Sequence, residues 1–252
     1  MPFLATNPAT EEVIAEYPTL SPAELDVALE RAHDAFLTWR STPMATREEV
    51  LRRAAELLEG EVPVVGQLMT SEMGKTFASA KGEAAKCAMT MRYYAEHAAS
   101  MLSEQSIATS AQRSGVRFEP IGVIFAVMPW NFPFWQVIRM AIPTLMAGNV
   151  VAFKHAPNVP GSARYLEDLF VRAGFPPGVL SSLFVEVDQV PGIIADARVR
   201  AVSLTGSERA GRSVAEHAGQ NLKKCVLELG GSDPFIVAAS ADLEHTIPLA
   251  VT

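Results

Sequence analysis

Two polar side chains stand out in the segment 125–157, FAVMPWNFPFWQVIRMAIPTLMAGNVVAFKHAP, which is otherwise almost entirely apolar. Asn131 lies between Trp130 and Phe132, and Arg139 has no acidic neighbour along the chain. Burying an amide or a guanidinium without a partner costs free energy, so this placement needs a reason beyond packing. Asn131 and Arg139 are therefore candidate functional residues.

An acidic residue, Glu228, ends the apolar run in KKCVLELGGSDP, residues 223–234. Side chains alternate along a strand, so Cys225 shares a face with Leu229 while Glu228 points the other way. A desolvated carboxylate has a raised pKa and can serve as a general base near neutral pH. The residues alone leave open the alternative of a structural glutamate paired with a lysine.

Both cysteines are expected to be packing residues. Cys225 lies on the strand face opposite Glu228, so the two side chains cannot meet across a substrate. Cys87 lies among alanines on an expected helix, which fits a core position. The histidines and cysteines show no spacing typical of a metal site, so no metal is expected. No Gly-x-Ser-x-Gly nucleophile motif is present.

Two further segments could contact a ligand. Gly206 and Ser207 follow an apolar strand in SLTGSERAG and open a helix, whose free N–H groups could bind a phosphate. The same residues would also suit an ordinary helix start. Lys154 ends another strand in KHAPNVPG, where a dinucleotide ribose would lie, although a plain surface lysine is the alternative.

The hydrophobic pattern indicates which elements position these residues. Strands and helices alternate from Ile121 onward, which predicts βαβ units and a parallel sheet buried on both faces. Ligands bind such sheets at the carboxyl ends of the strands. The expected strands are 123–128, 149–154, 180–187, 199–205, 224–229 and 234–238, and the expected helices are 135–146, 160–173, 189–196 and 207–219.

The first half of the chain reads as helical. Ser21 can cap a helix over 21–40 with Pro22 in its first turn, and Thr46 is expected to cap a second helix. A third helix is expected over 81–102, and the polar residues 103–120 read as an exposed hairpin. The last residues, DLEHTIPLAVT, also read as helical.

Length and composition place the chain among globular proteins. It has 252 residues, of which 49% are apolar, a net charge of −7 and two cysteines. The acidic balance argues against nucleic acid and anionic membranes as partners. No signal peptide is recognised at the N-terminus, and no apolar run is long enough to span a bilayer. We therefore expect a soluble, cytoplasmic protein.

Together these segments resemble the aldehyde dehydrogenase superfamily, closest to its succinate-semialdehyde dehydrogenase branch. The matching motifs are PWNFP at 129–133, GNVVAFKHAP at 148–157, TGSERAG at 205–211 and ELGGSDPFIV at 228–237, with NPAT and EMGKTFASAKGE earlier in the chain. The resemblance implies a Rossmann-like α/β fold that binds NAD or NADP. It implies oxidation of an aldehyde, here succinate semialdehyde, through a cysteine thiohemiacetal and a thioester.

The resemblance also implies roles for particular residues. Asn131 would stabilise the oxyanion, Glu228 would activate the water that hydrolyses the thioester, and Arg139 would hold the carboxylate of the substrate. A helix arginine that reaches solvent is the alternative for Arg139. Residues that match the cofactor cleft are Trp130, Asn131, Lys154, His155, Ala156, Pro157, Gly206, Ser207 and Leu229.

Two departures from the family pattern matter. Pro157 replaces a glutamate that grips the ribose hydroxyls in NAD-preferring members, so NADP is admissible. The family's catalytic cysteine is absent, because no cysteine follows Glu228. We therefore expect the N-terminal half of an enzyme that is a dimer or tetramer when complete, and expect this chain to be inactive alone. The alternative is a non-catalytic nucleotide-binding or oligomerisation fragment.

The resemblance divides the chain into three parts. Residues 1–102 would form the N-terminal helical part of the cofactor domain, residues 103–120 the oligomerisation hairpin, and residues 121–252 an incomplete Rossmann-like NAD(P)-binding domain. The nucleophile would come from a separate domain.

Overall fold

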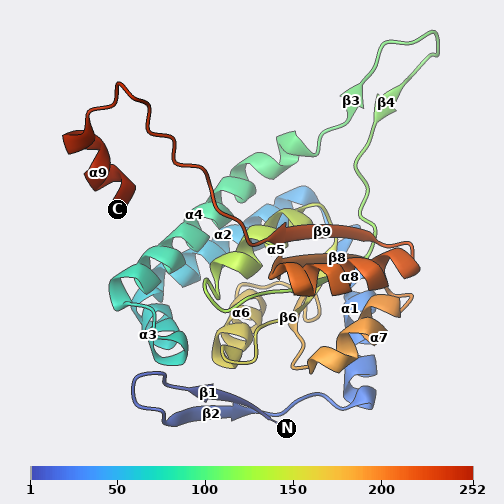
Figure 1. Ribbon diagram of the computed structural model, residues 1–252. Coiled ribbons are helices and arrows are strands. Elements are labelled where there is room, and N and C mark those ends of the chain that lie inside the picture. Colours follow the sequence, from blue (N-terminus) through green and yellow to red (C-terminus); the bar gives the residue numbers. More distant parts are fainter. Residues whose placement is uncertain (1, 252) are drawn as a thin grey trace.

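Five parallel strands form the central sheet of the protein, seen in a computed structural model that describes residues 2–251 (Figure 1). The strands lie in the order β7-β6-β5-β8-β9. The chain builds outward from β5 to β7 and then returns to build β8 and β9, so the strand order reverses between β5 and β8. Their bounds are Val123–Val127 for β5, Val150–Lys154 for β6, Leu180–Ser182 for β7, Val199–Gly206 for β8 and Lys224–Leu229 for β9.

Helices cover both faces of this sheet. The crossovers on the two sides of the point where the strand order reverses run in opposite directions. Because each crossover is right-handed, their helices lie on opposite faces of the sheet. The helices α5 and α6 therefore lie on one face, and α7 and α8 lie with α1 on the other (Figure 1). The α/β fold class and the parallel sheet are confirmed. The helix bounds are Trp135–Met146 for α5, Pro160–Arg172 for α6, Val190–Ala195 for α7 and Glu208–Gln220 for α8.

The first long helix, α1 (Pro22–Trp39), starts as predicted. Ser21 accepts a hydrogen bond from Glu24 N at 3.3 Å, and the Glu24 carboxylate accepts one from Ser21 N at 2.8 Å. This reciprocal capping box satisfies two N–H groups that the helix itself cannot pair.

Two other predicted helix starts were wrong. The helix α2 (Met44–Gly60) begins before Thr46, because the Pro43 carbonyl already accepts from Thr46 N at 3.1 Å and makes it part of the first turn. The helix α4 (Phe77–Met101) begins four residues before the predicted start, since Thr76 caps it by accepting from Ser79 N at 3.4 Å.

Three N-terminal elements were not predicted. The strands β1 (Phe3–Thr6) and β2 (Val13–Tyr17) pair antiparallel across the NPAT turn. The helix α3 (Val62–Met73) contains Pro63 in its first turn and Gly66 in its interior, which obscured its pattern. These elements pack below α6 and beside α4 (Figure 1).

The hairpin and the C-terminal segment extend from this body (Figure 1). Strands β3 (Gln105–Ser106) and β4 (Gly115–Val116) pair antiparallel, which confirms the predicted hairpin as a structure; its role in oligomerisation stays a prediction. The predicted strand 234–238 is wrong. It pairs with no strand among the described residues, and Ile236 is 87% exposed, because this segment leaves the sheet after β9. The helix α9 (Leu243–Val251) follows.

A continuous apolar core runs from Phe3 to Ala218 and joins the helices to both sheet faces. The buried guanidinium of Arg47 ties two helix ends together over this core. Its Nη1 donates to Met146 O at 2.9 Å, and its Nη2 donates to Trp39 O at 2.9 Å and Arg40 O at 3.0 Å. No helix within residues 2–251 is long and apolar enough to cross a membrane.

Candidate active site

Six of the predicted site residues line one pocket at the carboxyl ends of the strands. The pocket has a volume of about 440 Å³ and lies between the loop after β5 and the ends of β8 and β9. Parallel strands bring their carboxyl ends to the same edge of the sheet, which explains why segments about a hundred residues apart meet there. The lining residues are Pro129, Trp130, Asn131, Gln136, Thr205, Gly206, Ser207, Glu228, Leu229 and Gly230.

The loop that carries Asn131 faces outward. Asn131 is exposed, and the Trp130 side chain beside it is 51% exposed. The apolar surroundings of Asn131 in the sequence had suggested a buried amide, and this expectation was wrong. The loop lies at the open edge of the sheet, and within residues 2–251 only its end, at Pro133 and Phe134, is buried.

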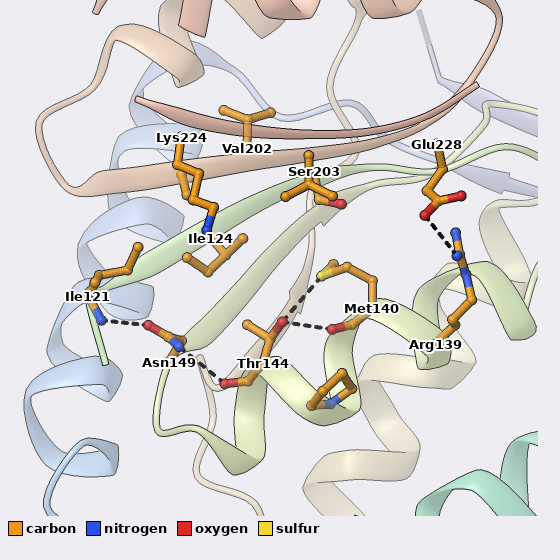
Figure 2. Close-up of a pocket in the computed structure, with 13 residues that line it drawn as sticks. Ile121, Ile124, Arg139, Met140, Thr144, Asn149, Val202, Ser203, Lys224 and Glu228 are labelled. Atoms are coloured by element: carbon orange, nitrogen blue, oxygen red, sulfur yellow. Dashed lines mark hydrogen bonds and ion pairs between the residues drawn. The ribbon is translucent and has the colours of Figure 1, made fainter. Parts of the chain in front are cut away.

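Glu228 and Arg139 form an ion pair (Figure 2). Arg139 Nη1 lies 3.4 Å from Glu228 Oε1, and the side chains are 34% and 55% exposed. Arg139 has no acidic neighbour along the chain, and the fold supplies one from a strand far away in sequence. The expectation of a desolvated Glu228 carboxylate was wrong, because its side chain is 55% exposed. The physical reason is that, among the described residues, β9 lies at one edge of the sheet and Glu228 lines the open groove beside α5.

The Arg139 guanidinium has two further partners that the sequence did not indicate. Its Nη2 donates to Thr205 Oγ1 at 3.2 Å and to Gln136 Oε1 at 3.4 Å. Its Nε is buried and bonds no group among the described residues. The guanidinium is thus held at one end of a groove, with hydrogen-bonding capacity left over.

The groove itself, drawn in Figure 2, runs along the open face of β8 and β9 beside α5 and has a volume of about 350 Å³. Arg139 and Glu228 close one end, and Lys224 lies toward the other, near Ile121 and Asn149 (Figure 2). Its walls between these ends are mostly apolar, with Thr144 and Ser203 as the polar exceptions. Val226 and Glu228 both line the groove, which confirms the predicted alternation along β9.

Gly206 and Ser207 form the turn from β8 into α8. Ser207 is the N-cap and accepts from Ala210 N at 3.3 Å, as an ordinary helix start requires. The space beside Gly206 is open, since a Cβ there would meet only Leu204, at 3.8 Å. Gly211, by contrast, is needed for packing, because a Cβ would lie 2.5 Å from Leu229 Cδ2. Leu229 thus reaches the α8 side of the sheet.

Lys154 and His155 are both buried, which excludes the plain surface lysine. Lys154 is 5% exposed, its Nζ donates to His155 O at 3.3 Å, and it lies 5.6 Å from the centre of the Phe3 ring. Burial lowers the pKa of Lys154, and the Glu186 carboxylate opposes that shift. The next residues, Ala156 and Pro157, turn outward into an increasingly exposed loop.

His155 joins β6 to the loop that carries Asn131. Its Nδ1 accepts from Ala156 N at 2.9 Å, so its Nε2 carries the proton and donates to Pro133 O at 2.8 Å. Both ring nitrogens are occupied by the backbone. The ring therefore holds the buried end of the Asn131 loop in place, and the role of His155 in cofactor binding stays a prediction.

Neither cysteine reaches the pocket. Cys87 is fully buried in α4, and burial raises its pKa well above the usual value. Cys225 packs toward α8 with a pKa that burial raises, and this places it on the sheet face opposite Glu228. Both cysteines are packing residues, as predicted. Within residues 2–251 no group of acidic, histidine and cysteine side chains is arranged to hold a metal ion.

The buried His155 ring predicts a pH-dependent stability. Burial lowers its pKa from 6.5 to about 4, so only the unfolded chain takes up a proton between these values. The stabilisation is complete above pH 6.5 and is lost as the pH falls toward 4, by roughly 2–3 kcal/mol at pH 4.5. Urea unfolding at pH 7.0 and 4.5 should show this loss in the wild type and a smaller one in His155→Gln.

The control for that measurement is His245→Gln, on the exposed helix α9. Other titrating groups are shared by all three proteins and cancel in the comparison. Equal pH dependence in the wild type and His155→Gln would contradict the assignment of a buried neutral imidazole.

Comparison with known proteins identifies the family. The model of the aldehyde dehydrogenase family matches residues 2–252. A succinate-semialdehyde dehydrogenase [NADP(+)] of Mycobacterium avium is 50% identical over 256 residues, which cover all of this chain and 54% of that protein. A relative of the same name from Mycobacterium tuberculosis is 49% identical, with 56% of its length covered. The chain spans about half the length of the curated relatives it matches.

Solved structures show the same arrangement. Gox0499, from a study of cofactor and substrate selection, superposes with a TM-score of 0.97 at 40% identity, over all of this chain and 55% of that one. The succinic semialdehyde dehydrogenase of Streptococcus pyogenes, in complex with NADP+, gives a TM-score of 0.94 at 39% identity, over 97% of this chain and 54% of that one. This chain belongs to the aldehyde dehydrogenase family.

Proposed function

We propose that this chain is the cofactor-binding half of an NADP-dependent enzyme that oxidises succinate semialdehyde to succinate. The observation that carries the proposal is the single pocket that collects Asn131, Glu228 and the β8–α8 turn, with Arg139 beside it. A relative named succinate-semialdehyde dehydrogenase [NADP(+)] aligns over the whole chain at 50% identity. We infer that the relatives' remaining length corresponds to the part of the enzyme that supplies the nucleophilic cysteine.

The pocket residues fit a dinucleotide. The turn at Gly206 leaves room for a ligand against the backbone, and the first N–H groups of the 13-residue helix α8 suit a pyrophosphate. Trp130 and Leu229 offer exposed apolar surface for the nicotinamide end. Lys154, Ala156 and Pro157 would meet the adenosine ribose at the end of β6. When bound, NADP would accept a hydride from the aldehyde carbon.

The two candidate catalytic residues would act at different moments. A cysteine thiolate adds to the aldehyde carbon, and the carbonyl oxygen takes the negative charge that the Asn131 amide would stabilise. One such donor is worth on the order of 3 kcal/mol in a dry site. After oxidation the thioester carbon is attacked by water. Glu228 would take a proton from that water, and the thiolate leaves as the carboxylic acid forms.

Arg139 provides the reason to propose a semialdehyde. Its pairing with Glu228 is half exposed at 3.4 Å, and such pairs contribute only about 0–1 kcal/mol. A substrate carboxylate that makes a forked pair with the guanidinium could replace this contact at little cost. The exchange would hold the substrate and free the Glu228 carboxylate in the same step. Arg139 would thus couple substrate binding to release of the general base.

Separation of the two catalytic roles is the first test. In the full-length enzyme, Asn131→Ala should slow the first turnover, because it weakens the oxyanion contact. Glu228→Gln should keep a rapid burst of NADPH and slow the later turnovers, since only thioester hydrolysis needs the base. Stopped-flow absorbance at saturating substrate measures both phases. Indistinguishable traces for the two variants would refute the assignment.

The substrate carboxylate is tested at Arg139. Arg139→Gln should raise KM for succinate semialdehyde by about 10- to 100-fold, as expected for a lost charge-assisted pair. Butanal, which has the same chain length without the carboxylate, should show no such rise. The control is Arg212→Gln on the exposed face of α8. A similar KM change for both aldehydes would show that Arg139 acts through structure and not through the carboxylate.

Cofactor choice is tested at the loop after β6. A carboxylate at position 157 would accept hydrogen bonds from the ribose hydroxyls and repel a 2′-phosphate, whereas Pro157 does neither. We expect the enzyme to use NADP at least as well as NAD, and Pro157→Glu to raise KM for NADP. Lys154→Ala should weaken both cofactors, NADP more. The measurement is kcat/KM for each cofactor at fixed ionic strength, because salt screens the phosphate contact. Strong preference for NAD, unchanged by Pro157→Glu, would point to another loop.

A further inference from the structure

The loop that carries Asn131, residues 129–134, ends on a buried carboxylate. Glu83 Oε1 accepts from Phe134 N and from Trp135 N, each at 2.9 Å, and the Glu83 side chain is 1% exposed. These are N–H groups at the start of α5, which the helix cannot pair itself. A negative charge at this end is also favoured by the helix dipole. Glu83 therefore sets where the loop stops and α5 begins.

Lys75 holds this carboxylate and contacts the loop directly. Its Nζ lies 2.5 Å from Glu83 Oε2 and 3.6 Å from the centre of the Phe132 ring. Phe132 is the residue after Asn131. The Lys75 ammonium therefore contacts both the Glu83 carboxylate and the loop that carries Asn131. The Lys75 side chain is only 9% exposed and that of Glu83 1%, so their ion pair is largely desolvated.

The connection between α3 and α4 fixes Lys75. Gly74 ends α3 in the left-handed region at φ 75°, where a Cβ would lie 3.1 Å from Pro8 Cγ. Thr76 then caps α4. Lys75 is thus the single residue between a helix end and a helix cap, and its backbone has little freedom.

We propose that Lys75 and Glu83 are positioning residues for Asn131, which hold its loop in place through Phe132 and through the first N–H groups of α5. The proposal rests on the function proposed for Asn131. An oxyanion donor works only if its position is set before the reaction, and a misplacement of about 1 Å can cost on the order of a hundredfold in rate. Neither residue lines the pocket, so both act through the loop.

The chain contains a matched control in Glu72. This buried glutamate accepts from Gly161 N at 2.6 Å and from Ser162 N at 2.8 Å, at the start of α6. Like Glu83 it is buried and accepts from the first N–H groups of a helix, but it bonds α6 instead of the Asn131 loop and also accepts from Ser162 Oγ at 2.8 Å. A role limited to stability would therefore give Glu72 and Glu83 variants the same consequences.

The first measurement is amide hydrogen exchange in the full-length enzyme. The double variant Lys75→Met/Glu83→Gln removes both charges and leaves neither ion unpaired, so it should still fold. We expect exchange at Phe134 and Trp135 to rise about tenfold. Glu72→Gln should raise exchange at Gly161 and Ser162 only. Phe132→Leu, at a ring that is 43% exposed, should raise exchange in the loop a few-fold, and it provides the test if the double variant misfolds.

The second measurement is the NADPH burst of the full-length enzyme. The double variant should slow the burst about tenfold at unchanged KM for NADP, whereas Glu72→Gln should leave it within twofold. Normal exchange at Phe134 and Trp135, or a normal burst despite faster exchange, would overturn the positioning role. A normal burst in Asn131→Ala would instead refute the oxyanion role, and faster exchange would still show that Lys75 and Glu83 anchor the loop.

Discussion

Buried charges at the ends of α5 and α6 are the constraint on which the rest of the structure depends. Glu83 pairs the first N–H groups of α5, and Glu72 pairs those of α6. Arg47 pairs the Met146 carbonyl at the far end of α5. Helix ends buried without partners would cost several kcal/mol. Side chains from the N-terminal helices thus pair the backbone groups at the ends of α5 and α6. The helices that cover this face of the sheet depend on the N-terminal helices for these hydrogen bonds.

The loop that carries Asn131 is held at its buried end, while the pocket that it lines is open to solvent. His155 and Glu83 contact the buried end of the Asn131 loop, and Lys75 contacts the Phe132 ring beside Asn131. Asn131 itself faces outward at the carboxyl edge of the sheet. Such a division suits a site in which the donor must be fixed while ligands enter from outside. The open groove beside α5 continues the same edge.

Arg139 and Glu228 show how an edge strand changes the chemistry of its residues. Glu228 would be desolvated in the middle of a parallel sheet, but at the edge it turns toward α5 and pairs with Arg139. The pair is exposed enough to be weak, and a weak pair can be exchanged. A second carboxylate that approaches the guanidinium competes with Glu228, so substrate charge and base position are linked in the proposed reaction.

Much of this protein could be predicted from the sequence by itself. The alternation of apolar segments from Ile121 onward determined the parallel sheet, and the capping residues around Ser21 determined the start of α1. Strand alternation placed Cys225 and Glu228 on opposite faces, and the motifs identified the family. These features are local or periodic, so neighbouring residues carry them.

Only the tertiary structure decided which groups the polar side chains pair with. Nothing near Glu83 in the chain indicates that it accepts from Phe134 N, about fifty residues away, and nothing near Arg139 indicates Glu228. The segment 234–238 has the apolar pattern of a strand but no adjacent strand to pair with among the described residues, so the prediction of a strand there was wrong. The exposure, pairing and burial of a polar group depend on which distant elements the fold places beside it. Local sequence patterns do not contain that information.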